Sequence, residues 1–167
     1  MQRSLRRRRH EHKTDYKARL ALLESGKPRI VVRKSNRYIL VQAVTTSGAQ
    51  DRVIASITSK ALLKKGWPAA NAASLKSLPA AYLIGFLFAQ QLKGKCEEAL
   101  FDTGMHRNIH KSRLYAVLKG LLDAGLRVPH SDEALPSEED LQRTPHLRDI
   151  LAEIRQSTNH GRERNKE

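Results

Sequence analysis

The chain contains a single cysteine, Cys96, among its 167 residues. One thiol excludes an internal disulfide and a zinc site built on cysteines, and it suits a reducing compartment. Cys96 is therefore expected to be an inert packing residue rather than a reactive thiol.

Long apolar runs are also missing. The longest, LPAAYLIGFLFA at residues 78–89, has 12 residues, whereas about 20 are needed to span a bilayer. This run is interpreted as a buried helix, and no membrane partner is expected. The opening residues MQRSLRRRRHEHK have no apolar stretch behind their cations, so they are not expected to act as a secretory signal.

Acidic residues are scarce and unevenly placed. The chain has 31 Lys and Arg against 17 Asp and Glu, a net charge of +14. Residues 1–130 hold 25 basic and 8 acidic side chains, whereas residues 131–167 hold 6 and 9. Such a basic fold repels itself unless a polyanion lies against it, and nucleic acid is the commonest such partner. The first 130 residues are expected to bind it.

Composition divides the chain into three segments. Residues 1–13 carry six basic side chains and almost nothing apolar, so this basic arm is expected to be disordered on its own and to fold onto nucleic acid. Residues 14–135 are expected to form one globular domain with a real core. Residues 136–167 are expected to be an extension with a helix over 145–156, whose apolar side is Leu147, Ile150, Leu151 and Ile154.

Hydrophobic periodicity predicts the elements of the globular part. A first helix runs from Thr14 to a stop at Gly26, with Tyr16, Leu20 and Leu23 on one side. The further expected elements are two strands within residues 28–44, a strand over 52–59 with Val53, Ala55 and Ile57 on one face, a short helix over 59–65, a helix over 79–93, a strand over 97–104 and a helix from Leu114 to Gly125. The fold class is therefore α/β, with a mixed sheet made of an antiparallel meander plus a further strand, and with packed helices.

The first two strands are joined by a tip with three cations and no acid, Arg33-Lys34-Ser35-Asn36-Arg37. Like charges repel one another in the free protein, and the phosphates of a nucleic acid would relieve this repulsion. Ser35 and Asn36 can make the turn and also hydrogen-bond to sugar or base. The alternative is a solvated turn whose charges protect a sheet edge from aggregation.

A second basic loop, DTGMHRNIHKSR at residues 102–113, follows the expected fourth strand. Gly104 could allow the backbone to approach phosphate, and open α/β sheets tend to bind ligands at this end of a strand. Its Asp-Thr-Gly triplet also occurs in aspartic proteases, which need two such aspartates, and the chain has one copy. His106 and His110 lack the further ligands that a metal site requires.

Catalysis by a metal-dependent nuclease would need clustered carboxylates. In residues 1–130 only Glu97, Glu98 and Asp102 lie close together, and strand alternation places Glu98 and Asp102 on one side with Glu97 opposite. An enzyme is therefore not expected, and neither a cofactor, a metal nor a catalytic residue is assigned. The nuclease stays a rival that a cleavage assay with magnesium would test.

Three stretches carry a family resemblance. RRRRHEHKTDYKARLALLESGKPRIVVRKSNRYILVQAV, LPAAYLIGFLFA and LFDTGMHRNIHKSRLYAVLKGLLDAGLRVPHSDEALPSEE occur in this order within residues 3–140. Together they resemble the archaeal and eukaryotic branch of the large-subunit ribosomal protein family that binds 5S rRNA, the eighteenth protein in large-subunit nomenclature. The regions near residues 67–80 and beyond about residue 143 vary within that family, so no contact is carried over there.

The resemblance implies a structural protein of the cytoplasmic ribosome. It implies that the chain attaches 5S rRNA to the central protuberance of the large subunit, with large-subunit rRNA and neighbouring ribosomal proteins as further partners. The alternative is an RNA- or DNA-binding protein outside the ribosome. Carried to matching positions, the family's RNA contacts fall on Arg6, Arg7, Arg8, Arg9, Lys13, Tyr16, Arg29, Arg33, Lys34, Ser35, Asn36, Arg37, Gln42, Gly104, Arg107, Lys111 and Arg113.

Overall fold

A computed structural model of the chain describes residues 6–47, 50–143, 148 and 152–153. Its α-helices are α1 (Arg7–His10), α2 (Tyr16–Glu24), α3 (Leu78–Leu92), α4 (Arg113–Asp123) and α5 (Glu138–Gln142). Its strands are β1 (Arg29–Lys34), β2 (Ile39–Ser47), β3 (Gln50–Thr58) and β4 (Leu100–Asp102). Three 3-10 helices complete the fold: η1 (Ser59–Lys65), η2 (Ala69–Ser74) and η3 (Asp132–Ala134).

The four strands form one mixed sheet in the order β3-β2-β1-β4. β1 pairs antiparallel with β2, and β2 with β3, which confirms the meander. β4 returns from the far end of α3 to lie parallel to β1, with Ile30 opposite Phe101. The α/β fold class with a mixed sheet is confirmed, and β4 is shorter than the strand expected over 97–104.

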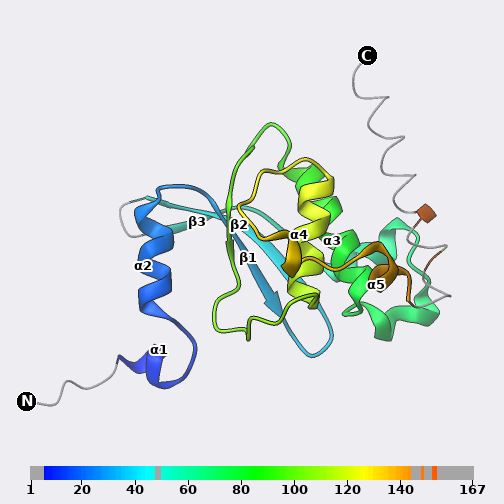
Figure 1. Ribbon diagram of the computed structural model, residues 1–167, viewed down its shortest axis with the longest axis horizontal. Coiled ribbons are helices and arrows are strands. Elements are labelled where there is room, and N and C mark those ends of the chain that lie inside the picture. The colour runs from blue at the N-terminus through cyan, green and yellow to red at the C-terminus, as the bar shows by residue number, and fades with distance from the viewer. Residues whose placement is uncertain (1–5, 48–49, 144–147, 149–151, 154–167) are drawn as a thin grey trace, which may run out of the picture.

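One face of the sheet carries the hydrophobic core. Ile30, Val32, Ile39, Val41 and Ala43 are all buried there, as the alternation along β1 and β2 predicts. Figure 1 shows α3 and α4 together on this side of the strands and α2 on the other side. α3 is apolar all round, so it can be covered by neighbouring elements on nearly all sides.

The two central helices approach each other closely at glycines. A Cβ atom on Gly85 of α3 would lie 2.2 Å from the carbonyl oxygen of Val117 in α4. A Cβ atom on Gly120 of α4 would lie 2.1 Å from the carbonyl oxygen of Tyr82 in α3. The missing side chains of Gly85 and Gly120 thus let the backbones of α3 and α4 pack closely against each other.

A β-bulge breaks the alternation expected along β3. Ala43 pairs with Ala55 but Val44 pairs with Val53, so Ile54 is an extra residue in β3. Ala55 and the partly buried Ile57 contact the core, whereas Val53 lies on the opposite face and is half exposed. The expectation that Val53 shares a face with Ala55 is wrong, because two-residue periodicity fails across a bulge.

The side of α2 that faces the sheet is not its apolar stripe. Ala18, Arg19 and Leu22 point toward the strands, whereas Leu20 is 58% exposed. Small and amphipathic residues let α2 lie over a polar sheet face rather than over the core. The stripe of Tyr16, Leu20 and Leu23 is therefore not the inner face of this helix.

Two further segments have more structure than the sequence predicts. The arm, expected to be disordered on its own, has one helical turn at α1, whose Arg8 carbonyl accepts hydrogen bonds from Lys13 and Thr14. The loop after η1 contains η2, which is anchored by the buried Trp67. Among the described residues, no helix is both long enough and apolar enough to cross a membrane.

At the C-terminal end, α5 packs against the domain. Ser137 and Asp140 form a capping box, and Leu141 is 1% exposed within the core. The helix expected over 145–156 and its apolar stripe lie outside the described residues, apart from residues 148, 152 and 153. The division of the chain at residues 13 and 135 stays a prediction.

Candidate nucleic-acid interface

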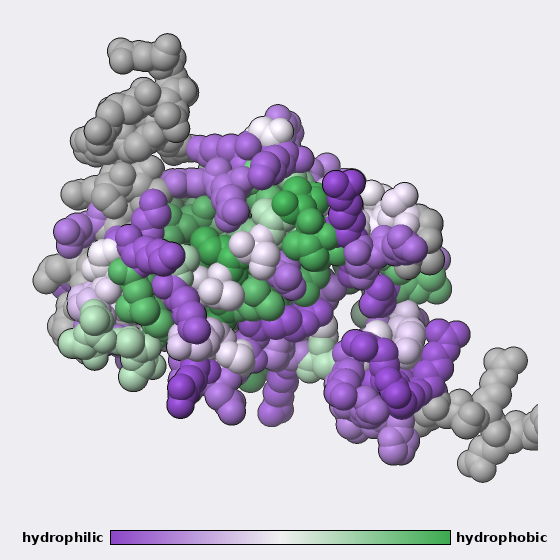
Figure 2. All heavy atoms as spheres, turned by 180° about the vertical axis from the view of Figure 1, so that it is seen from behind, coloured by the Kyte–Doolittle hydropathy of each residue, from purple (hydrophilic) through white to green (hydrophobic). Residues whose placement is uncertain are grey.

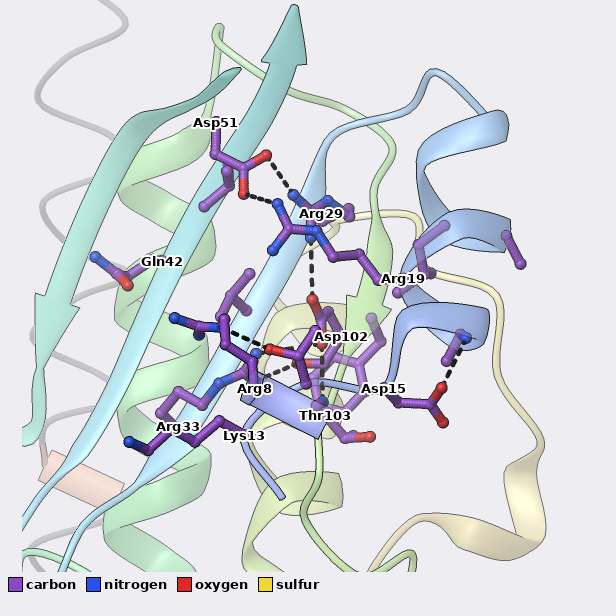
Figure 3. A pocket seen from close by; sticks show the side chains of 18 of the residues that line it. Arg8, Lys13, Asp15, Arg19, Arg29, Arg33, Gln42, Asp51, Asp102 and Thr103 are labelled. Carbon is purple, nitrogen blue, oxygen red and sulfur yellow. Dashed lines mark hydrogen bonds and ion pairs between the residues drawn. The ribbon is translucent and has the colours of Figure 1, made fainter. Parts of the chain in front are cut away.

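A cleft of about 690 Å³ lies between α2 and the sheet face opposite the core. Its walls come from the arm, α2, β1, β2, β3 and the loop after β4, which are distant in sequence. Figure 3 shows their charged side chains converging on the cleft. The predicted site residues that line it are Arg8, Lys13, Arg29, Arg33, Gln42 and Gly104.

Arg29 is the buried support of this cleft. Its side chain is 4% exposed, and its guanidinium donates to Asp51 at 2.9 Å, to Asp102 at 3.2 Å and to Thr46 at 3.2 Å. A buried guanidinium is tolerated only when its donors are satisfied in this way. Arg29 therefore ties β1 to both β3 and β4 and presents little charge to solvent.

Asp51 extends the same network to α2. It accepts a hydrogen bond of 2.9 Å from Arg19 in α2. Burial alone would raise the pKa of Asp51, but the Thr46 hydroxyl and the charges of Arg29 and Arg19 lower it below its ordinary value. Asp51 is thus a stable anion at neutral pH and holds α2 over the sheet.

Asp102 connects the tip of the first hairpin to the loop after β4. One carboxylate oxygen accepts from Arg29, and the other accepts from Arg33 at 3.4 Å and from the backbone N–H of Gly104 at 2.8 Å. Arg33 also donates to the Asp102 carbonyl oxygen at 3.1 Å. The aspartate of the Asp-Thr-Gly triplet therefore orients a cation and a loop instead of a catalytic water.

Gly104 has a positive φ of +60°, which favours glycine. A Cβ atom at this position would lie 2.8 Å from the guanidinium carbon of Arg33. The missing side chain therefore makes room for Arg33 in the cleft, and the N–H of Gly104 is directed at Asp102. Arg33 itself stays 42% exposed at the mouth of the cleft.

The tip and the loop are also connected by a histidine. The backbone N–H of Lys34 donates to Nε2 of His106 at 3.2 Å. Burial, together with the charges of Arg33 and Lys34, lowers the pKa of His106 below its ordinary value. The neutral ring is therefore favoured, and it holds the tip and the loop at one end of the sheet.

The tip itself is a tight turn closed by Ser35. The Ser35 hydroxyl donates to the Tyr38 carbonyl and accepts from the Tyr38 N–H. Lys34, Asn36 and Arg37 are exposed around it. Ser35 thus shapes the turn, and the cations beside it project outward.

The arm is held against the first helix by two arginines. Arg8 donates to the Thr14 hydroxyl at 2.9 Å, and the Arg6 guanidinium lies 4.7 Å from the centre of the Tyr16 ring. In Figure 2 the region of α1 stands apart at the lower right as a cluster of hydrophilic side chains. Arg7, Arg9 and Lys13 are exposed on it, and Glu11 pairs with Arg7 and Lys13.

The remaining predicted cations lie on or beside the loop after β4. Arg107 and Arg113 are exposed, and Lys111 is exposed with its ammonium 3.6 Å from Asp140. Lys111 has a positive φ of 55°, held by its N–H bond to the Ala134 carbonyl. This strained backbone fixes the direction of the loop.

The predicted residues thus fall into two groups. Six line the cleft. The other eleven lie outside it and are called the rim; all but the half-buried Tyr16 are exposed: Arg6, Arg7, Arg9, Tyr16, Lys34, Ser35, Asn36, Arg37, Arg107, Lys111 and Arg113. The sequence analysis missed the groups that orient them, which are Thr14, Arg19, Thr46, Asp51, Asp102 and His106. Only the two aspartates had a signal in the sequence, the rarity of acids, since only eight occur in residues 1–130.

The residues considered for metal or thiol chemistry have other roles in the structure. Glu98 pairs with Lys27 on the surface, and Asp102 lies between two arginines. The Cys96 thiol donates to the Glu98 carbonyl, and burial raises its pKa. The described residues contain no group of three or more His, Cys, Asp and Glu side chains placed to hold a metal ion.

Comparison with known proteins gives one consistent family. A family model described as "Ribosomal large subunit proteins 60S L5, and 50S L18" matches residues 1–99. The chain is 53% identical over 137 residues to the large ribosomal subunit protein uL18 of Korarchaeum cryptofilum, covering 81% of this chain and 68% of the relative.

Two further archaeal relatives agree. The large ribosomal subunit protein uL18 of Caldivirga maquilingensis is 43% identical over 153 residues, which cover 90% of this chain and 72% of the relative. The uL18 protein of Aeropyrum pernix is 45% identical over 135 residues, which cover 80% of this chain and 61% of the relative. By sequence, and with a mixed α/β fold that presents a basic cleft and rim, this chain belongs to the family of large-subunit ribosomal proteins that contains uL18.

Proposed function

We propose that this chain binds 5S rRNA and attaches it to the large ribosomal subunit in the central protuberance. The observation that supports this most is the cleft, where residues of three predicted basic segments meet. Arg8 and Lys13 come from the arm, Arg33 from β1 and Gly104 from the loop after β4. One continuous RNA surface can contact all three segments at once.

Membership of this family makes the chain a structural component of the large subunit in the cytoplasmic ribosome, and not an enzyme. Its partners are rRNA and other large-subunit proteins. Binding without chemistry requires groups that position RNA and stay in place. The ion-pair network around Arg29, Asp51 and Asp102 supplies that rigidity.

The proposed mechanism is recognition of RNA shape through many phosphate and sugar contacts. Asp102 and Gly104 hold Arg33 at the mouth of the cleft, so the cation loses little side-chain entropy on binding. The exposed cations of the tip, arm and loop then contact phosphates around it. Asp102 already compensates the charge of Arg33 in the free protein, so the complex would relieve mainly the repulsion between Lys34 and Arg37.

Competition between RNAs tests the proposal. Labelled 5S rRNA bound to the full chain should resist displacement by tRNA at 150 mM salt and yield to unlabelled 5S rRNA. Copurified RNA from the source cells should contain 5S rRNA when sequenced. Equal displacement by both RNAs would instead indicate a sequence-tolerant nucleic-acid binder outside the ribosome.

Salt dependence tests the electrostatic part separately. If about six to ten phosphates are neutralised, affinity should fall on the order of a thousandfold or more between 50 and 200 mM salt. A nearly flat plot of log affinity against log salt would contradict binding through this basic surface.

A further inference from the structure

A second basic surface lies outside the cleft and rim. From Arg52 to Cys96 the chain contains no Asp or Glu. Seven basic side chains occur in this stretch: Arg52, Lys60, Lys64, Lys65, Lys76, Lys93 and Lys95. A face that serves only solubility commonly mixes both signs of charge, so a run of cations this long without an acid calls for a partner that supplies the anions.

The lysines of η1 are displayed on a rigid support. Leu62 and Trp67 are fully buried, and the backbone N–H of Trp67 donates to the Leu62 carbonyl at 3.0 Å. Gly66, with φ of 101°, ends η1 between them. Lys60, Lys64 and Lys65 therefore stay exposed on a segment that cannot turn away from solvent.

None of these three lysines forms an ion pair within the part of the chain that the structure describes. Several other exposed cations do, including Lys13 with Glu11 and Lys27 with Glu98. The charges of η1 thus repel one another, and no acid among the described residues compensates them.

This surface begins where the tip ends. Thr58 pairs with Leu40, which lies opposite Arg33, so η1 starts beside the tip end of the first hairpin. The Lys60 ammonium lies 4.8 Å from the centre of the Tyr38 ring, next to Arg37. The cations of η1 therefore continue those of the tip, but on the side of the sheet where α3 packs, opposite the cleft.

We propose that Lys60, Lys64 and Lys65 form a second phosphate-binding surface for rRNA, distinct from the cleft. This inference rests on the proposed function, since it assumes that the chain binds rRNA. Lysine ammonium groups contact phosphates as point charges, and such contacts carry no sequence information. The surface therefore adds affinity and orientation, and it brings RNA to both faces of the sheet.

A pair of double variants with the same change of charge tests the proposal. Lys64→Gln/Lys65→Gln removes two charges from η1, and Lys93→Gln/Lys95→Gln removes two beyond the other end of α3. Each is titrated with 5S rRNA alone, and each 5S complex is then titrated with large-subunit rRNA, from 50 to 200 mM salt. Circular dichroism checks that both variants fold.

In one of the two titrations, the η1 variant should lose on the order of tenfold or more in affinity at 100 mM salt. Its slope of log affinity against log salt concentration should also be smaller by up to about two. The titration that changes identifies which RNA occupies the surface. The Lys93/Lys95 variant should stay close to wild type in both. Equal losses in the two variants would mean a general charge effect and would overturn the proposal.

Unchanged binding of the η1 variant in both titrations would also overturn it, and would leave an acidic protein as the partner of these lysines. Failure of the proposed function looks different, because the wild-type chain would then show no preference for 5S rRNA over tRNA. The two failures are therefore distinguishable in one set of titrations.

Discussion

At the scale of single residues, the interface depends on groups that carry no positive charge. Asp102 accepts hydrogen bonds from Arg29, Arg33 and Gly104, and so connects β1 to the loop after β4. Gly104 then leaves the space that the Arg33 guanidinium occupies. The Arg33 guanidinium is thus oriented in the free protein, which would lower the entropy cost of binding RNA there.

Two glycines with similar backbones separate strain from positioning. Gly104→Ala and Gly26→Ala both place a side chain at φ near +60°, which costs about 1–2 kcal/mol. Only the first also displaces Arg33, since nothing lies within 4 Å of a Cβ atom on Gly26.

Both variants should lose similar free energy of unfolding in urea. Gly104→Ala alone should also lose about 1–3 kcal/mol of RNA-binding free energy, as for a hydrogen bond to a charged group. Equal RNA affinities would contradict a positioning role for Gly104.

His106 should make the stability of the free protein pH-dependent. Burial and the charges of Arg33 and Lys34 lower its pKa in the folded state. The contribution of the neutral His106 ring to the free energy of unfolding is therefore fully present above the ordinary histidine pKa of about 6.5. It is lost as the pH falls from there toward the folded-state pKa. Protonation also removes the acceptor for the Lys34 N–H.

The measurement is the free energy of unfolding of wild type and His106→Gln between pH 5 and 8. The difference between the two proteins should change with pH below about 6.5, because an amide does not titrate. A constant difference over the whole range would show that His106 does not couple folding to protonation.

At the scale of elements, the pairing of α3 with α4 supports both sides of the interface. α3 packs against η1, and α4 begins directly after the loop that carries Arg107 and Lys111. The glycines Gly85 and Gly120 let the two helix backbones approach each other. The distance between η1 and the loop thus depends on the absence of two side chains in the core.

Gly85→Ala should therefore be strongly destabilising despite the better helix propensity of alanine. Its Cβ atom would meet the Val117 carbonyl, which belongs to the backbone and cannot rotate away. We expect a loss of about 3 kcal/mol, or a fall in melting temperature of about 10 °C. Gly94→Ala is the control, because its φ is +76° but nothing lies within 4 Å, and it should lose less. Similar melting temperatures for the two variants would contradict tight helix packing.

At the scale of the whole molecule, charge is concentrated at the N-terminal side. Residues 1–13 carry six basic side chains and one acid, whereas residues 144–167 carry five basic and four acidic side chains. α5 belongs to the core through Leu141 and adds three acids, one of which lies beside Lys111. A truncation that keeps the fold intact should therefore follow Arg143 rather than the boundary predicted at residue 135.

Deleting residues 1–13 should weaken 5S rRNA binding strongly at low salt and reduce the salt slope, because it removes the charges of the arm. Deleting residues 144–167 should leave binding nearly unchanged, since it removes a net charge of only +1. Filter binding of both truncations beside the full chain measures this, with circular dichroism as the control for folding. A C-terminal deletion that folds yet loses more affinity than the arm deletion would contradict this division.

Local patterns in the sequence were sufficient for most elements and for the polyanion. Alternation identified the buried faces of β1 and β2, and the periods in residues 79–93 and 114–125 located α3 and α4 within a residue or two. The net charge and its distribution pointed to nucleic acid without any fold. These properties depend on neighbours along the chain, so a sequence determines them directly.

Tertiary structure decided which of the predicted cations are free and what orients them. Arg29 and Arg33 look alike in sequence, yet one is buried between Asp51 and Asp102 and the other stands at the mouth of the cleft. The bulge at Ile54 and the inner side of α2 were equally beyond periodicity, because each depends on a partner strand or face far away in sequence. Ion pairs and close backbone approaches join residues some 70 positions apart, as Arg33 and Asp102 do, and only the folded chain brings such residues together.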